Sequence, residues 1–192
     1  MILPVNIIGT SVLRKQAEDI DKNYKNLSET IEDMFKTMYQ SDGVGLAAPQ
    51  VGKAIKLFVV DASPMADEDP ECENYKKVFI NAEILDYSEE KIIMNEGCLS
   101  LPGVREDITR SESIHIKYYD ENFKFHEETL SGFRARVVQH EYDHTQGILF
   151  TDRLASLKKT LIKNKLKAIA NGKFKAKYKV KIADKKIKNV FA

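Results

Sequence analysis

The spacing of apolar residues predicts a helix near the start of the chain. Four apolar side chains recur there at helical intervals: Ile31, Met34, Phe35 and Met38. This spacing predicts an amphipathic helix that begins after Asn26 or Ser28, ends near the Asp42–Gly43 pair and turns its apolar stripe toward the core.

The middle of the chain has the composition of β-strands, and a second helix follows it. Five segments, several of them rich in Val, Ile, Tyr and Phe, are predicted to be strands: 56–61, 77–82, 90–94, 113–119 and 123–130. Short polar links between them indicate antiparallel sheets. A helix predicted from Phe133 to Gln146 packs against these strands, which gives an α+β fold with the sheets around this central helix.

The last forty residues have a different pattern and a strong positive charge. Residues 153–192 hold fourteen Lys or Arg against one acid, a net charge of +13, so the overall +1 leaves −12 for residues 1–152. An amphipathic helix ended by Asn171 and Gly172 is predicted from a row of apolar residues: Leu154, Leu157, Leu161, Ile162, Leu166 and Ile169. From Lys173 to Ile182 lysines alternate with mostly apolar residues, which predicts a strand with one cationic face.

Candidate chemistry comes from the run His140-Glu141-Tyr142-Asp143-His144 within the predicted central helix. Residues four apart lie on one face of a helix, so both imidazoles can reach one metal ion. A metal ion lowers the pKa of its bound water, and the Glu141 carboxylate beside it can take the water proton. The motif therefore indicates metal-assisted hydrolysis.

A catalytic site of this kind typically has a third protein ligand. Phe150 occupies the position of the third histidine of metzincin proteases, and no glutamate follows Glu141. The third ligand is therefore expected upstream, where four candidates occur: Cys98, Cys72, His115 and His126. Cys72 lies in a predicted solvated acidic loop, and a structural role is favoured for both histidines, whereas Cys98 follows a glycine that permits close packing. A small buried hydrophobe is the alternative interpretation of Cys98.

Three motifs occur in an order and spacing that resemble the peptide deformylase family: residues 43–50 (GVGLAAPQ), 96–100 (EGCLS) and 139–144 (QHEYDH). The resemblance covers about the first 150 residues. It implies a metal site formed by Cys98, His140 and His144, and removal of the formyl group from the initiator methionine of nascent polypeptides. It implies Glu141 as general base and acid, with the side chain of Gln50 and the N–H of Leu99 as donors to the developing oxyanion.

The resemblance and the donor types also constrain metal and substrate. A thiolate and two imidazoles suit one divalent ion per chain, and the resemblance implies iron(II) in the cell, with zinc, nickel or cobalt as substitutes. The glycines around Val44 and Gly45 would let a substrate peptide lie against the chain as an added strand. Arg105 is implied to face the substrate backbone, and Phe133 and Val137 are candidates for the methionine pocket; a surface role for Arg105 and core packing for the other two are the alternatives. By the same resemblance, Arg110 is expected to hold Asp143.

Composition agrees with a single globular unit, divided into a catalytic domain at 1–152 and a basic C-terminal helix and tail at 153–192 of the same structural unit. No apolar stretch approaches the length of about 18 residues that spans a bilayer, and no leader is evident, so we expect a cytoplasmic monomer. The two distant cysteines give no disulfide framework.

Two interpretations of the basic tail stay open. Its lysines can form a solvated face that protects an exposed strand edge, or an electrostatic footprint for ribosomal RNA, which the resemblance favours. Two other classes of protein also remain as alternatives: a zinc peptidase, and a non-enzymatic RNA-binding protein with a structural metal whose four ligands leave Glu141 without a use.

Overall fold

The computed structural model describes residues 1–183 and contains three sheets and three α-helices. The α-helices are α1 (Leu27–Gln40), α2 (Gly132–Thr145) and α3 (Ser156–Ala170). The strands are β1 (Val5–Asn6), β2 (Gly45–Ala47), β3 (Leu57–Asp61), β4 (Lys76–Tyr87), β5 (Lys91–Gly97), β6 (Arg105–Ser111), β7 (Ser113–Tyr119), β8 (Phe125–Ser131) and β9 (Val180–Lys181). Short 3₁₀ helices are η1 (Ser11–Arg14), η2 (Ala48–Val51), η3 (Ser63–Met65), η4 (Pro70–Cys72) and η5 (Phe150–Arg153).

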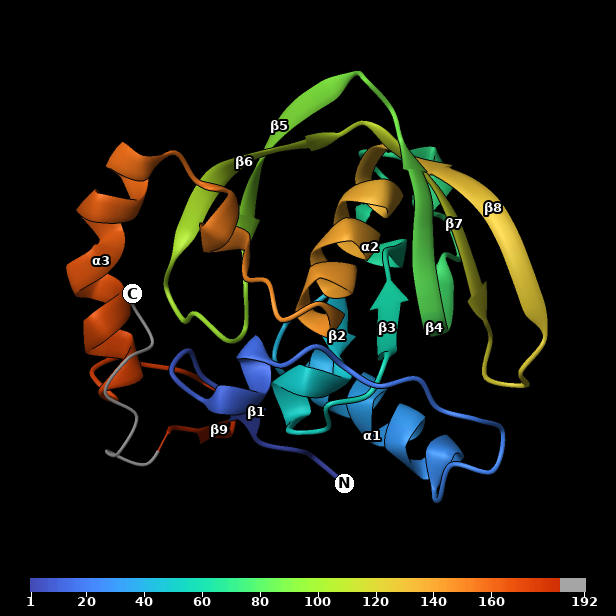
Figure 1. Ribbon diagram of the computed structural model, residues 1–192, viewed down its shortest axis with the longest axis horizontal. Helices are drawn as coiled ribbons and strands as arrows, with labels where there is room; N and C mark the ends of the chain where they lie inside the picture. The colour runs from blue at the N-terminus through green and yellow to red at the C-terminus, as the bar shows by residue number, and fades with distance from the viewer. Residues whose placement is uncertain (184–192) are drawn as a thin grey trace.

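The predicted α+β architecture is confirmed, and helix α2 lies in the middle of the molecule (Figure 1). An antiparallel five-stranded sheet of order β2-β3-β4-β7-β8 lies to one side of α2, and the separate antiparallel β5-β6 pair crosses above it. Apolar side chains of the large sheet, such as Phe58 and Ile116, form a core with Val138 of α2. The functional helix is therefore held by contacts on several faces, which keeps its polar side chains in fixed positions.

Helix α1 follows the sequence prediction closely. Met34 and Met38 of its apolar stripe are fully buried and pack with Leu46 and Leu57 of the sheet. Asn26 occupies the N-cap position, but it has a left-handed backbone (φ 58°) and its side chain makes no capping hydrogen bond. Packing of the apolar face, rather than the predicted side-chain cap, therefore accounts for the position of this helix.

The five predicted strands are confirmed in place, β7 with the predicted bounds, but β4 and β5 are longer than predicted. Strand β4 continues to Tyr87, past the predicted end at residue 82, and β5 continues to Gly97. Strand β6 was missed because its sequence, REDITRS, is mostly polar and lacks an apolar alternation. Its inward positions are filled by Ile108 and by the buried, charge-paired Arg110.

The C-terminal segment follows the prediction in part. Helix α3 ends at Ala170, and Asn171 and Gly172 follow it as expected, Gly172 with a left-handed backbone (φ 78°). Leu166 and Ile169 are buried, but Leu157 and Leu161 are 73% and 74% exposed, so the predicted apolar stripe is only partly covered. The strand predicted over 173–182 is wrong except at Val180–Lys181, the two residues that pair with β1. The part of the tail from 184 to 192 lies outside the described residues, and the boundary at residue 152 stays a prediction.

The acidic segment between β3 and β4 is exposed as predicted at Asp67, Glu68, Glu71 and Glu73, but the prediction was wrong for Cys72. Cys72 is fully buried in the core, and Asp69 accepts a hydrogen bond from the Phe133 N–H at the start of α2 (3.3 Å). Glu71 forms an ion pair with Arg134 of the same helix. The segment therefore packs on the N-terminal end of α2, where negative charge is favourable. Among residues 1–183, no helix combines the length and apolar character needed to cross a bilayer.

Candidate metal centre and active site

Helix α2 and the end of β5 bring three metal-binding side chains together. His140 and His144 lie one turn apart on α2, and Cys98 follows directly after β5. One donor atom of each lies within 4.8 Å of the donor atoms of the other two, and the Cys98 Sγ is 3.3 Å from the His144 Nε2. Both histidines are buried, so an ion held here would be largely shielded from bulk solvent.

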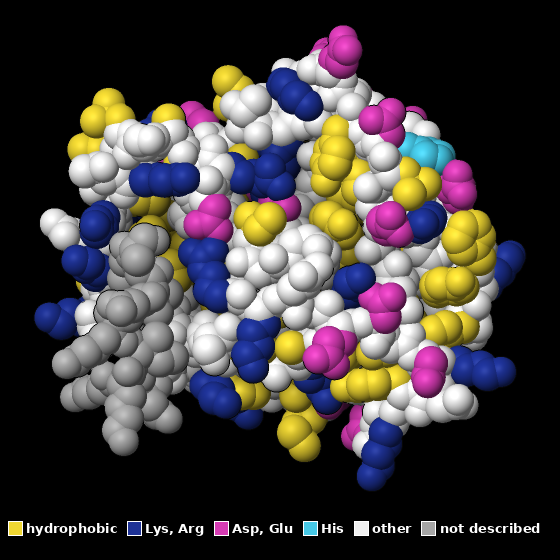
Figure 2. Space-filling model, viewed as in Figure 1, with side chains coloured by type: hydrophobic (Ala, Val, Ile, Leu, Met, Phe, Trp, Pro, Cys, Tyr) yellow, Lys and Arg dark blue, Asp and Glu magenta, His cyan; other side chains and the backbone are white. Residues whose placement is uncertain are grey.

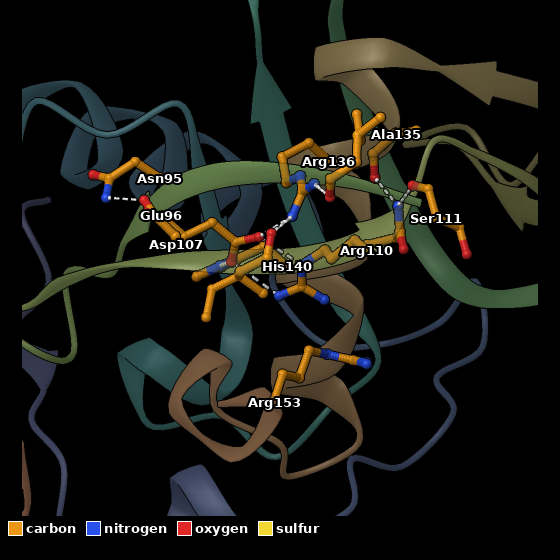
Figure 3. Close-up of polar contacts among 12 residues, drawn as sticks. Asn95, Glu96, Asp107, Arg110, Ser111, Ala135, Arg136, His140 and Arg153 are labelled. Atoms are coloured by element: carbon orange, nitrogen blue, oxygen red, sulfur yellow. Dashed lines mark hydrogen bonds and ion pairs between the residues drawn. The ribbon is translucent and has the colours of Figure 1, made fainter. Parts of the chain in front are cut away.

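His140 is oriented by the buried carboxylate of Glu96, the first residue of the EGCLS motif, for which the sequence predicted no role. The Glu96 carboxylate is 2.8 Å from His140 Nδ1 and also accepts hydrogen bonds from Arg110 and Arg136 (Figure 3). This contact fixes the ring and leaves Nε2 as the nitrogen able to bind a metal. Burial by itself would raise the pKa of Glu96, but the hydrogen bonds from His140 and Arg110 outweigh it and hold that pKa well below its usual range.

Asp143 is held at the far side of the same network. Its carboxylate accepts hydrogen bonds from Arg110 (2.7 Å) on β6 and from Arg153 (2.6 and 2.5 Å) on η5. The contact between Arg110 and Asp143 is therefore present as expected. Arg110 joins two carboxylates, Glu96 and Asp143, and so ties β5, β6 and α2 together.

The Glu141 carboxylate is buried and points toward the glycine-containing segment before η2. A Cβ added at Gly45 would lie 2.5 Å from Glu141 Oε1, so any side chain there would displace the carboxylate. Within residues 1–183, Glu141 Oε2 has no hydrogen-bond partner. Burial raises the pKa of Glu141 to about 7. A carboxyl group with such a pKa can both accept and return a proton near neutral pH.

Gln50 has its amide held in one orientation. Its Oε1 accepts a hydrogen bond from the Ala47 N–H (2.7 Å), so the amide NH₂ points the other way, toward Cys98 Sγ (3.5 Å) and Ser100 Oγ (3.4 Å). The side chain is 1% exposed. The Gln50 amide is therefore a fixed donor directed at the metal-binding cluster.

A cavity of about 380 Å³ opens beside this cluster. Its walls include most of the predicted site residues, contributed by several separate elements: Val44, Gly45, Gln50, Cys98, Leu99, Arg105, Phe133, Val137, His140 and Glu141. Arg105 lies at its exposed rim, where its guanidinium donates to the Asn95 side chain (2.8 Å) and carbonyl (3.1 Å). The cavity also contains residues that sequence reasoning missed, among them Met94, Val104 and Tyr178. The motifs gave no signal for these because they belong to other segments of the chain.

The other metal-ligand candidates lie away from this cavity and have ordinary partners. His115 lies 2.9 Å from a Glu127 oxygen, and His126 lies 2.7 Å from an Asp120 oxygen, both at the hairpin of β7 and β8. Cys72 is enclosed by the core. The structural roles favoured for the two histidines agree with these contacts.

The residues present at the site fit a divalent transition metal. A cysteine and two histidines with converging donor atoms are ligands that such ions prefer. Among the described residues, the buried Glu141 Oε2 beside the cluster has no hydrogen-bond partner, which is common where a site is built for a further group. The set has three protein ligands beside a cavity, as in a catalytic metal site rather than a closed structural one.

Comparison with known proteins finds relatives along almost the whole chain. The family described as "Polypeptide deformylase" matches residues 2–160. A protein of Christiangramia forsetii named "Peptide deformylase" is 51% identical over 97% of this chain and 98% of its own, and one of Flavobacterium psychrophilum with the same name is 50% identical over 97% of this chain and 100% of its own.

Solved structures give the same result for the fold. A crystal structure of peptide deformylase from Thermotoga maritima has a TM-score of 0.73 and 42% identity, covering 81% of this chain and 99% of its own. A structure of peptide deformylase from Plasmodium falciparum has a TM-score of 0.78 and 34% identity, covering 88% of this chain and 95% of its own.

Proposed function

This chain belongs to the polypeptide deformylase family and is a metal-dependent hydrolase that removes the N-formyl group from nascent peptides, and we propose that its Cys98, His140 and His144 hold the metal ion. The observation that carries the assignment of these residues is the convergence of their donor atoms within 4.8 Å, beside the buried carboxylate of Glu141. Family membership favours this activity over the peptidase and the non-enzymatic RNA-binding alternatives.

Glu141 is proposed as the residue that moves protons. When bound, a divalent ion supplies a Lewis acid that polarises the formyl carbonyl and lowers the pKa of a coordinated water molecule to about 7. The Glu141 carboxylate, unpaired at Oε2 within the described part of the chain, takes the proton of the attacking water and returns it to the amine that leaves. Gly45 leaves the space that this carboxylate needs.

Gln50 and Leu99 are proposed as the donors that stabilise the oxyanion formed from the formyl oxygen. The Gln50 NH₂ group is held toward the metal-binding cluster by the contact of its Oε1 with Ala47, so it needs no reorganisation during the reaction. Leu99 directly follows the ligand Cys98 and lines the same cavity. Each such donor typically lowers the barrier by about 3 kcal/mol.

The cavity is proposed to bind the methionyl peptide. Val44, Phe133 and Val137 supply apolar walls for the methionine side chain, and the segment around Gly45 is placed to pair with the peptide backbone. Arg105 is at the rim, tied to Asn95, where it can donate to a substrate carbonyl.

Formate release is the direct test of this activity. We expect the purified protein, loaded with iron(II) without oxygen, to release formate from a formylmethionyl tripeptide and to leave an acetylmethionyl tripeptide intact, because a methyl group in place of the formyl hydrogen crowds the carbonyl beside the metal site. Iron is our proposal for the ion used in the cell, and zinc, nickel and cobalt proteins are compared in the same assay. Absence of formate with all four metals, each shown to be bound, would contradict the proposed function.

We further propose that helix α3 binds ribosomal RNA, so that a cytoplasmic, monomeric enzyme meets nascent chains as they emerge. Figure 2 shows basic side chains along the left edge of the molecule, where α3 lies, and the basic residues of α3 are all lysines. Lys159 and Lys163 lie one turn apart on α3, and both are exposed. An exposed basic face of this kind suits an RNA backbone.

Reversing charges on α3 tests this second proposal. We expect the double variant Lys159→Glu/Lys163→Glu to lose at least tenfold in ribosome affinity at low salt, and to show a smaller dependence of affinity on salt, because two phosphate contacts are lost. Cosedimentation at several salt concentrations measures both quantities. The control is Lys22→Glu/Lys25→Glu, which makes the same change in net charge at exposed lysines far from α3 in sequence. Equal affinity of the α3 variant and the control would reject the proposal.

A further inference from the structure

Tyr178 reaches the active site from the C-terminal tail. Its hydroxyl donates a hydrogen bond to the Leu99 carbonyl (2.7 Å), and its side chain lines the cavity that contains Cys98 and Glu141. The family match ends at residue 160, so Tyr178 lies in a segment outside the part of the chain that the family description covers. None of the sequence motifs includes this residue.

The tail is fixed in place directly after Tyr178. Strand β9 pairs in parallel with β1, and the Val5 and Ile7 N–H groups donate to the Lys179 and Lys181 carbonyls (2.9 Å each). Figure 1 shows β9 beside β1 at the lower left of the molecule. Gly172 ends helix α3 before this segment. Tyr178 is therefore held next to a paired strand rather than at a loose end.

The N-terminal strand that anchors the tail also contacts both proposed oxyanion elements. The Asn6 side chain donates to the Gln50 carbonyl (3.1 Å), and the Ile8 N–H donates to the Ser100 carbonyl (2.9 Å). Residues 5–8 thus connect the tail with the two segments that carry Gln50 and Leu99. The hydrogen bond from Tyr178 to the Leu99 carbonyl is a direct contact between the tail and the segment that carries Leu99.

Helix α3 adds two further contacts, to the loop after Leu99 and to the start of β6. Lys165 Nζ donates to the Gly103 carbonyl (2.5 Å), and Lys158 lies 3.3 Å from a Glu106 oxygen. The C-terminal segment therefore contacts the chain between Leu99 and Glu106 at three points. Of the three C-terminal residues that make these contacts, Tyr178 is the one that lines the cavity itself.

We propose that Tyr178 is a positioning residue, which holds Leu99 in the conformation in which its N–H faces the developing oxyanion. This inference rests on the proposed oxyanion role of Leu99. The hydroxyl fixes the Leu99 carbonyl and thereby restricts rotation of the backbone next to the catalytic N–H. Burial and the nearby Cys98 raise the pKa of Tyr178 to about 12, so the hydroxyl keeps its proton and remains a donor at neutral pH.

The variant Tyr178→Phe tests the inference because it removes the hydroxyl and keeps the ring. We expect kcat for a formylmethionyl tripeptide to fall about fivefold, since one hydrogen bond that orders the donor is lost, while KM stays within about twofold. Metal content and melting temperature are expected to match those of the parent protein. Hydrogen exchange of peptides that cover residues 97–103 is expected to become faster in the variant.

Lys177→Gln is the matched control, because it changes an exposed neighbour in the same tail segment. It should leave kcat and exchange unchanged. Tyr178→Ala should lower kcat further than Tyr178→Phe. Unchanged exchange over 97–103, unchanged kcat, or a loss of kcat that merely follows a loss of metal in Tyr178→Phe would each overturn the inference. The exchange measurement does not depend on activity, so a parent protein that released no formate would reject the proposed function separately.

Discussion

The variant Glu141→Gln is expected to bind metal like the parent protein and to lose deformylation activity on the order of 10³-fold in kcat. Glutamine has nearly the same shape as glutamate but cannot accept a proton at neutral pH. The carboxylate is buried beside the cluster of Cys98, His140 and His144, and its Oε2 has no partner among the described residues, so removing its charge breaks no ion pair there. The loss should therefore appear in the chemical step.

Two measurements separate this effect from a structural one. Metal content by atomic absorption should equal that of the parent protein, and KM for a formylmethionyl tripeptide should stay within a few fold. Glu29→Gln, an exposed glutamate on helix α1, is the matched control and should retain full activity. A Glu141→Gln protein that keeps more than about a tenth of parental kcat with full metal occupancy would contradict the assignment of Glu141 as the base.

The variant Arg110→Leu is expected to lower the free energy of unfolding by about 3 kcal/mol and to weaken metal retention. Arg110 is 3% exposed and pairs with both Glu96 and Asp143. Its removal leaves these buried carboxylates with fewer compensating charges. Because Glu96 orients the His140 ring, a shift of Glu96 also disturbs a proposed metal ligand.

Urea unfolding, together with metal content after dialysis against a weak chelator, measures both effects. Arg153→Leu is the matched control, since Arg153 contacts the same Asp143 but its side chain is 36% exposed. We expect this control to lose clearly less stability than Arg110→Leu, because solvent screens the charge of a partly exposed partner. Equal and small losses in the two variants, with unchanged metal content, would show that Arg110 does not organise the site.

The sequence by itself determined the elements whose signal is local. The helical spacing from Ile31 to Met38 and the strand composition around Ile116 each lie within one segment, and both elements formed where expected. The candidate metal-binding side chains could also be predicted. The spacing of His140 and His144 places both on one helix face, and the family motifs pointed to Cys98.

Strand β6 could not be predicted from the pattern of its own residues. The sequence REDITRS has no strand-like alternation, yet it pairs with β5 and carries Arg110 into the core. The same holds for the acidic segment that contains Asp69, which docks on helix α2 through contacts 64 residues apart. Burial of charged groups becomes favourable only when partners from distant segments are in place.

The tertiary structure also decided where the C-terminal segment packs and which residues it contacts. The predicted apolar stripe of α3 included Leu157, Leu161, Leu166 and Ile169, but of these four only Leu166 and Ile169 are buried against the rest of the chain. The contact of Tyr178 with Leu99 spans 79 residues, and no periodicity in the sequence encodes it. Sequence patterns determine the period and polarity of each segment. The positions of Glu96, Gln50 and Tyr178 around one cavity depend instead on how the segments pack, because packing brings together groups that are remote along the chain.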